Sequence, residues 1–218
     1  DALQRLAVSE YGEEAAPTVR EAWRLCSESY RQYPYHMVML YKGPQHMGPS
    51  NPILSHPSGY NATMVGLPYD NLDGWRAVYP TDVWLQQMDL CAQGFQDGAQ
   101  LLEKARDRVS GQFRNALDNE IRRMKTVYIH LKSGAEQGRF IDARNRLATA
   151  KTETERQELR NIMKKALAAE RSLIIQMLPL CSEDSSIGYE SSNQYFYIPL
   201  DLIEALASIS YAERKMTQ

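Results

Sequence analysis

The spacing of apolar residues predicts amphipathic helices along most of the chain. In the first, at about residues 2–33, apolar positions recur every three or four residues, and Gly12 interrupts the pattern. After that glycine the apolar face consists of Ala15, Val19, Ala22, Trp23, Cys26 and Tyr30. Since an α-helix turns once in 3.6 residues, these side chains share one face and predict packing against a neighbouring helix.

Three more stretches carry apolar seams whose steps alternate between three and four residues, at about 81–109, 113–147 and 152–180. This alternation is typical of helices that pack along their length. Ser110 and Gly111 mark the expected break between the first two. Thr152 followed by a glutamate three residues later is a capping-box pattern, which indicates a helix start. A short closing helix is expected from Pro199.

Two stretches between these helices have a different composition. Residues 34–80 hold seven of the ten prolines and five glycines, which no long helix tolerates, together with many tyrosines, methionines and leucines. We expect an ordered, packed loop there, with a short strand at 36–41. A second loop, rich in polar and aromatic residues, is expected at 182–198. The chain as a whole is therefore predicted to be an all-α antiparallel bundle of about five helices, forming one domain over residues 1–218.

Composition limits the classes of function. Lys and Arg total 25 and Asp and Glu total 27, so the net charge of -2 gives no overall attraction to nucleic acid. No apolar run reaches the roughly 20 residues that span a bilayer. No cofactor-binding or metal-ligand motif occurs, so neither a cofactor nor a metal is expected. The three dispersed cysteines are interpreted as free, buried residues, which favours a cytoplasmic setting only weakly. The chain begins at Asp1 without methionine, and we expect a fragment of a longer protein.

The clearest candidates for chemistry lie near the end of the first loop. Trp75 and Arg76 are bracketed by an acidic cluster, with Asp70 and Asp73 before them and Asp82 after them. Paired carboxylates can act as acid and base on a sugar, and an indole can stack on a sugar ring. The alternative is that Asp70 and Asp73 form turns and that Trp75 fills the core.

Other polar positions offer weaker alternatives. In the second loop, Glu190, Asn193 and Tyr195 are of the residue types that line carbohydrate-contacting surfaces, and equally of those that make a polar contact with another domain. Glu170 is the one charged member of an apolar seam. We expect it to pair with an arginine of the neighbouring helix, such as Arg144, or to act as a catalytic acid. Apart from that pairing, Arg144 belongs to a stretch expected to face solvent.

Several segments resemble a known group of proteins. The segment EYGEEAAPTVREAW, with Tyr11, Gly12, Ala15, Ala22 and Trp23, is similar to the start of the helical region that follows the catalytic barrel in several glycoside hydrolases. The stretches 51–80 and 184–204 resemble uncharacterised bacterial glycoside-hydrolase-like proteins. The resemblance implies a helical domain that packs on a catalytic barrel elsewhere in the parent chain. It transfers no catalytic residue to this chain.

Three functions remain open at this point. The leading hypothesis is an accessory domain of a carbohydrate-active hydrolase that packs on the barrel, helps to complete its glycan cleft and is not catalytic alone. The second is a structural module that holds a homodimer together and binds no ligand. The third is a self-contained enzyme that uses Asp70, Asp73 or Glu190.

Overall fold

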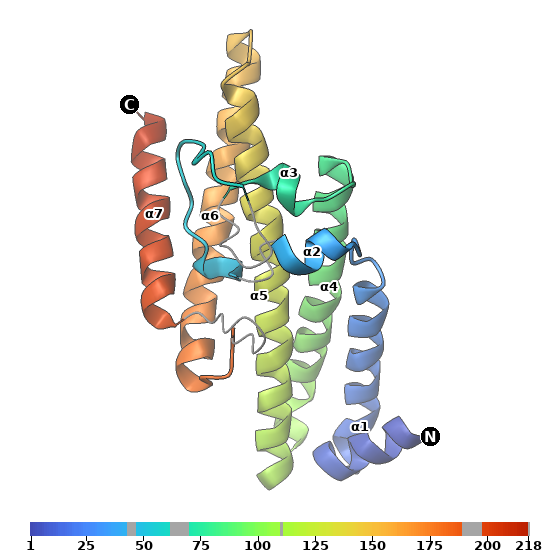
Figure 1. The fold of residues 1–218 in the computed structure, drawn as a ribbon. Helices are drawn as coiled ribbons and strands as arrows, with labels where there is room; N and C mark the ends of the chain where they lie inside the picture. Colours follow the sequence, from blue (N-terminus) through green and yellow to red (C-terminus); the bar gives the residue numbers. More distant parts are fainter. Residues whose placement is uncertain (43–46, 62–69, 110, 189–197, 218) are drawn as a thin grey trace. The chain divides into compact units, whose positions relative to one another are not determined.

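The computed structural model describes residues 1–42, 47–61, 70–109, 111–188 and 198–217, and within them every regular element is helical (Figure 1). This confirms the predicted all-α bundle. The five predicted helices correspond to long α-helices whose bounds are α1 (Ala2–Tyr30), α4 (Thr81–Ala105), α5 (Gly111–Leu147), α6 (Glu153–Glu183) and α7 (Pro199–Thr217). Residues 34–80 add α2 (Met37–Lys42), the 3₁₀ turn η2 (Gly48–Ser50) and α3 (Leu72–Trp75).

The strand predicted at 36–41 is wrong, because this segment forms the helix α2. The imidazole Nδ1 of His36 lies 3.1 Å from the backbone nitrogen of Val38 and accepts its hydrogen bond at the start of the helix. Met39 is fully buried, and its sulfur accepts a hydrogen bond from the indole nitrogen of Trp84 at 3.0 Å. A short apolar run satisfies either a strand or a helix, and here no described strand offers the backbone partners that a strand needs.

Contacts along the chain divide the described residues into two compact units. Unit 1 comprises residues 1–33 and 89–128, and unit 2 comprises residues 34–88 and 129–218. The sequence predicted one domain over residues 1–218. The boundaries between the two units fall after residue 33, within α4 and within α5.

The core of unit 1 is built from the predicted apolar seams. Most of the seam of α1 is buried, and it meets buried residues of α4 and α5 in one cluster. That cluster consists of Ala7, Tyr11, Ala15, Ala16, Val19, Ala22, Cys26, Ala99, Leu102, Val109, Leu117, Ile121 and Met124. Gly12 adopts a left-handed conformation, with φ of 81°, and produces a kink within α1 where the sequence predicted an interruption.

All three cysteines are free and buried, as expected. In unit 1, Cys26 and Cys91 lie where α1 and α4 meet, and the Cys91 thiol is 3.4 Å from the carbonyl oxygen of Ser29. Burial raises the pKa of Cys26 to about 11 and that of Cys91 to about 12. Both thiols are therefore protonated at neutral pH and serve as small core residues rather than as nucleophiles.

Unit 2 is organised around the second half of α5 together with α6 and α7. The connection 148–152 joins α5 to α6, which starts as predicted: the side chain of Thr152 accepts a hydrogen bond from the backbone of Glu155 at 3.1 Å. The α6 seam is buried from Leu159 to Met177, and α7 packs against both α6 and η2 (Figure 1). Unit 2 therefore packs η2, from the segment between α1 and α4, against α6 and α7.

The turn η2 approaches α5 closely. Gly48 has φ of 48°, and a Cβ atom at this position would lie only 2.4 Å from Nδ1 of His130 on α5. Only glycine combines this backbone conformation with such a short approach. The glycines and prolines of this segment thus permit close packing on the bundle as well as preventing a long helix.

Candidate functional site

The candidate site is the segment of unit 2 that carries Asp70, Asp73, Trp75 and Arg76, and it is fastened to the bundle by buried polar side chains. The carboxylate of Asp70 pairs with the guanidinium of Arg144 on α5 at 2.8 Å, and each side chain is only 5% exposed. The backbone nitrogen of Ser58 donates to the same carboxylate at 3.0 Å, and its hydroxyl donates to the other oxygen. Asp70 thus connects two parts of the loop to a helix.

Arg144 holds this arrangement through several donors. Besides Asp70, it donates to the backbone oxygen of Leu54 at 2.8 Å and to the side chain of Asn145 at 2.9 Å. The expectation that Arg144 faces solvent is wrong, because it is 6% exposed. A buried guanidinium requires compensating acceptors, and the loop supplies two of them.

A second polar cluster is centred on Gln137 of α5, about two helical turns before Arg144. The side-chain nitrogen of Gln137 donates to the backbone oxygen of Gly48 at 2.8 Å, and its oxygen accepts from Asn51 at 2.9 Å. The same nitrogen lies 3.2 Å from a carboxyl oxygen of Glu170 on α6, and the hydroxyl of Ser133 donates to that oxygen at 2.6 Å. The loop, α5 and α6 are therefore linked through one network.

Glu170 is the titratable side chain of this network, and its pKa is shifted well above the usual value. It is 1% exposed, and burial raises its pKa to about 8, although the hydrogen bonds from Ser133 and Gln137 act in the opposite direction. Its partners are these two neutral side chains, so the expected pairing with an arginine is wrong. Among the described residues, its second carboxyl oxygen has no hydrogen-bond partner. At neutral pH the group is a protonated acid enclosed within the scaffold.

The other candidates of the first loop do not form a cleft. Trp75 is fully buried, so the indole cannot stack on a ligand in this conformation. Asp73 pairs with Arg76 at 2.6 Å in an exposed contact, while Asp70 is enclosed by Arg144 and Ser58. The two aspartates thus have separate partners, and each stabilises local structure.

The candidates of the second loop, Glu190, Asn193 and Tyr195, lie outside the described residues, as does Phe196. Of the predicted loop 182–198, the structure describes residues 182–188 and 198. Asp184 closes a turn there by accepting from the backbone and the hydroxyl of Ser186 at 3.0 and 2.7 Å.

Three large apolar side chains in the segments next to α2 and α3 are exposed. Tyr35, Met37 and Val78 are 67%, 60% and 74% exposed, and we call them the Tyr35 patch. The hydroxyl of Tyr79 donates to the backbone oxygen of Tyr35 at 2.8 Å, which joins the two segments.

The turn that contains Val78 has a strained backbone and is stabilised by a side-chain hydrogen bond. Ala77 has φ of 53°, a left-handed conformation that costs roughly 1 kcal/mol for a residue with a Cβ atom. The guanidinium of Arg76 donates to the backbone oxygen of Tyr79 at 2.7 Å and holds this turn closed. Strain of this kind persists where the surrounding structure enforces it, and it is concentrated at functional surfaces.

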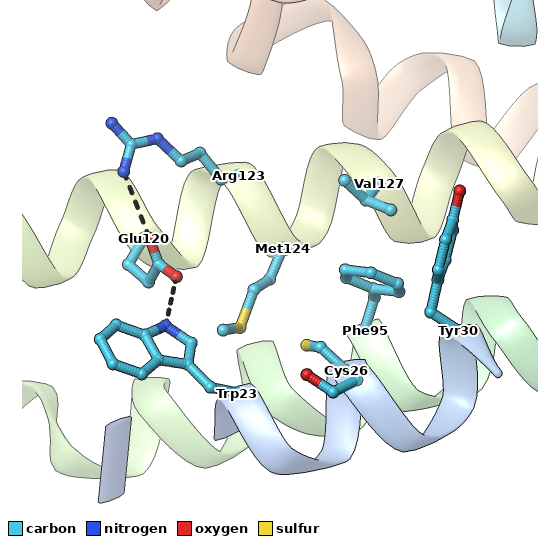
Figure 2. A pocket seen from close by; sticks show the side chains of 9 residues that line it. Trp23, Cys26, Tyr30, Phe95, Glu120, Arg123, Met124 and Val127 are labelled. Carbon is cyan, nitrogen blue, oxygen red and sulfur yellow. Dashed lines mark hydrogen bonds and ion pairs between the residues drawn. The ribbon is translucent and has the colours of Figure 1, made fainter. Parts of the chain in front are cut away.

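Unit 1 contains a groove of about 520 Å³ between its helices. Figure 2 shows Trp23 and Tyr30 at opposite ends, with Phe95 and Met124 between them. The indole nitrogen of Trp23 donates to Glu120 at 2.8 Å. Glu120 also accepts from Tyr11 and Arg123, each at 3.3 Å, so it holds Trp23 in place rather than acting as a base. Burial and this carboxylate raise the pKa of Tyr11 to about 12.

Sequence reasoning missed Ser133 and Gln137, although a signal for them was present. Ser133, Gln137, Phe140 and Arg144 follow one another at steps of four, three and four residues, so they occupy one face of α5. Polar groups within a buried stripe must find partners, and a proline-rich loop offers unpaired backbone carbonyls. The polar stripe of α5 therefore corresponds to the place where the loop is attached.

Two kinds of site were searched for among the described residues and not found. No group of three or more His, Cys, Asp or Glu side chains is placed there to hold a metal ion. In the described ranges, none of the helices combines the length and apolarity that crossing a membrane requires. Comparison of the chain with protein-family models, with curated proteins and with solved structures found no match.

Proposed function

We propose that this chain is an accessory helical domain of a carbohydrate-active hydrolase, which packs on the catalytic barrel of its parent chain and is not catalytic by itself. The observation that supports this proposal is the Tyr35 patch: three large apolar side chains, each at least 60% exposed, on a loop that buried polar contacts hold in place. A surface held in this way can be covered by a partner without a large loss of conformational entropy.

The resemblance of the segments 51–80 and 184–204 to glycoside-hydrolase-like proteins supplies the class of the partner. The local chemistry agrees with a non-catalytic role, because the candidate acids of the first loop are used in structure. Asp70 is enclosed in an ion pair with Arg144, and Asp73 pairs with Arg76. On α6, the partners of Glu170 are the neutral side chains of Ser133 and Gln137. A glycosidase needs two carboxylates on either side of the scissile bond. The barrel would supply them, and this domain would support one wall of the glycan cleft.

The proposal is tested by amide hydrogen exchange on the 218-residue chain and on its parent chain. We expect the amides of residues 35–37 and 76–79 to exchange more slowly in the parent chain, because the barrel covers the Tyr35 patch. Val78→Asp should leave the stability of the isolated chain within about 0.5 kcal/mol, since the side chain is exposed, but should lower the stability and hydrolase activity of the parent chain. Leu3→Asp, at an exposed position of unit 1, is the matched control.

Two outcomes would overturn the proposal. The first is hydrolysis of oligosaccharides by the isolated 218-residue chain at rates typical of an enzyme. The second is unchanged exchange at the Tyr35 patch in the parent chain. If light scattering then showed a homodimer that Val78→Asp converts to a monomer without loss of parent activity, the oligomerisation module would replace the accessory domain. Because Trp75 is fully buried, a substitution there cannot take the place of Val78→Asp as the test of a surface contact.

A further inference from the structure

One side-chain amide connects η2 to a buried acid. The side-chain nitrogen of Gln137 on α5 carries two hydrogens, and three acceptors lie within its reach. They are the backbone oxygen of Gly48 at 2.8 Å, the hydroxyl of Ser133 at 2.9 Å and a carboxyl oxygen of Glu170 at 3.2 Å. Since the contact with Glu170 is the longest, the two hydrogens are directed mainly at Gly48 and Ser133.

The acid itself lies where a negative charge would be poorly compensated. Glu170 is 1% exposed, and its second carboxyl oxygen has no hydrogen-bond partner among the described residues. Its first oxygen accepts from the neutral groups of Ser133, at 2.6 Å, and Gln137. A buried carboxyl group in such surroundings keeps its proton to a higher pH than an exposed one does. Glu170 is therefore a neutral acid that can ionise when the pH rises.

The charged groups of α5 near Glu170 do not favour its ionisation. Glu136, which is 7% exposed, contributes a like charge that raises the pKa of Glu170 further. Glu136 itself pairs with Lys132 at 2.8 Å and with Arg139 at 3.0 Å. His130 of α5 approaches η2 closely and is a second titratable group in this region. Any effect of pH on η2 must therefore be assigned to either the carboxyl group or the imidazole.

The other elements that meet here bring no further acid to η2. On α6, Arg171 follows Glu170 in the sequence and pairs with Glu213 of α7 at 2.6 Å. The turn η2, Gly48–Ser50, has no ionisable side chain of its own. It responds to charge only through the groups that hold it.

Ionisation of Glu170 changes the preference of the Gln137 amide. A hydrogen bond to a carboxylate is roughly twice as strong as one to a neutral acceptor. The amide nitrogen, now 3.2 Å from Glu170, is therefore drawn towards the carboxylate and away from the oxygen of Gly48. The same movement disturbs the bond that Asn51 donates to the side-chain oxygen of Gln137 at 2.9 Å. Two contacts between η2 and α5 thus depend on one proton.

We propose that Gln137 and Glu170 form a pH-sensitive switch, which holds η2 on α5 while Glu170 is protonated and releases it when the carboxyl group ionises. The proton passes from Glu170 to the solvent, and the amide of Gln137 turns from Gly48 to the carboxylate. This inference goes beyond the proposed packing on a barrel, because it uses no residue of the Tyr35 patch and applies to the isolated chain.

The test is NMR of the 218-residue chain, labelled at its isoleucine methyl groups, at pH 6, 7.5 and 9 with a neutral soluble nitroxide. The nitroxide broadens the signals of methyl groups that solvent reaches. Ile53, close to η2, is 5% exposed, whereas Ile174 of α6 and Ile209 of α7 are fully buried. We expect the broadening of Ile53 to rise about fivefold or more between pH 6 and pH 9, while Ile174 and Ile209 stay shielded. The midpoint should lie near pH 8, where Glu170 loses its proton.

Two variants assign the effect. Glu170→Gln keeps the shape of the protonated acid but cannot ionise, so Ile53 should stay shielded at every pH. This variant retains His130, and histidines ordinarily change charge between about pH 5 and 8, so it separates the two titrations. Gln137→Met removes the donor to η2, and Ile53 should then be broadened almost equally at pH 6 and pH 9. Glu158→Gln, on the exposed side of α6, is the matched control and should behave as the wild type does.

Three results would overturn the proposal. The first is that Ile53 stays shielded in the wild type at pH 9. The second is that Glu170→Gln shows the same rise in broadening as the wild type, which would assign the effect to another group. The third is that Ile174 is broadened together with Ile53, because ionisation would then unfold the unit instead of releasing η2. Circular dichroism checks that each variant folds, and Glu170→Gln alone decides the proposal if Gln137→Met does not.

Discussion

The two units bury different kinds of side chain. Unit 1 is closed by apolar seams, and its buried cluster contains alanines, leucines, valines and similar residues with one tyrosine. In the described part of the chain, the buried polar and charged side chains all belong to unit 2: Ser50, Asn51, Asp70, Ser133, Glu136, Gln137, Arg144 and Glu170. Unit 1 is thus held by apolar packing of helices, and unit 2 adds a polar network that attaches a loop.

This difference follows from what each unit must satisfy. Helices satisfy their own backbone groups, so their contacts in unit 1 can be almost entirely apolar. A proline- and glycine-rich segment has few internal backbone partners, so packing it requires hydrogen bonds from the scaffold. The side chains of Gln137 and Arg144 reach the carbonyl oxygens of Gly48 and Leu54 for this reason. Unit 2 should therefore respond strongly to the loss of single polar groups, and unit 1 to the loss of apolar volume.

The largest effect is expected for Asp70→Asn. The substitution leaves the guanidinium of Arg144, which is 5% exposed, without its charged partner, and breaking a buried pair in this way costs about 3–5 kcal/mol. Urea denaturation measures the change. Asp73→Asn is the matched control in the same loop, because its pair with Arg76 leaves Asp73 85% exposed and contributes less than about 1 kcal/mol. Similar losses for both variants would contradict the proposed polar attachment.

Removal of apolar volume from unit 1 should have the next largest effect. Leu117 is fully buried within the apolar cluster, and Leu117→Ala should lower the free energy of unfolding by about 3 kcal/mol through lost burial and a residual cavity. The loss should be the same at pH 5 and pH 8, because Tyr11 and Cys26 of this cluster have pKa values of about 12 and 11 and stay protonated over that range. A loss below about 1 kcal/mol would show that unit 1 does not depend on its apolar seam.

The stability of unit 2 should depend on pH through Glu170, whereas that of the apolar core of unit 1 should not. The pKa of Glu170 is raised from 4.5 to about 8, so the folded chain binds its proton more tightly than the unfolded chain. Its contribution to stability is full below pH 4.5 and declines as the pH rises towards 8, at a rate of at most about 1.4 kcal/mol per pH unit. Above pH 8 the carboxyl is ionised in both states, and the decline ends.

Glu170→Gln keeps the shape of the protonated acid and removes its titration. We expect the variant to be more stable than the wild type at pH 8, by up to about 4 kcal/mol, and nearly equal to it at pH 4.5. Denaturation at pH 4.5, 6 and 8 provides the comparison, with Glu158→Gln on the exposed side of α6 as the control. Parallel pH profiles for the wild type and Glu170→Gln would refute the assignment of a protonated carboxyl.

The smallest effect is expected at the polar contact of unit 1. Glu120→Ala removes the acceptor of the Trp23 indole and should cost about 1 kcal/mol. It should also lower the pKa of Tyr11 from about 12, since the carboxylate contributes to that shift. Ultraviolet titration of the phenols measures this change, and Glu103→Ala, which removes only an exposed pair with Lys125, should leave it unaltered.

The apolar packing of the helices can be predicted from the sequence, but much of the polar network of unit 2 cannot. The seams through Val19, Leu117 and Leu159 are periodic, and periodicity depends only on neighbouring positions. Glu170 was recognisable as the odd member of its seam, but its partners come from α5, 33 and 37 residues away. Such pairings depend on how helices and loop meet in three dimensions. The short helix α2 was missed because an apolar run of six residues has no decisive period.

The sequence indicates a segment that could carry chemistry, but it does not give the geometry of the side chains in that segment. The turn residues around Asp70 and Asp73 could be read from the sequence, since aspartate and glycine favour turns. The direction of each side chain could not: Trp75 lies fully inside, whereas Val78, three residues later, is 74% exposed. The left-handed conformation of Ala77 lies between them, and no residue preference predicts it for alanine.

Amide hydrogen exchange of the loop in unit 2 tests the polar attachment most directly. The backbone nitrogen of Ile53 donates to the hydroxyl of Ser208 at 2.9 Å, and that of Ser58 donates to Asp70 at 3.0 Å. At pH 6 we predict that both amides exchange at least a hundredfold more slowly than in an unfolded chain, and that Asp70→Asn removes most of the protection of Ser58. Exchange of both amides in the wild type at the rate of an unfolded peptide would contradict the account.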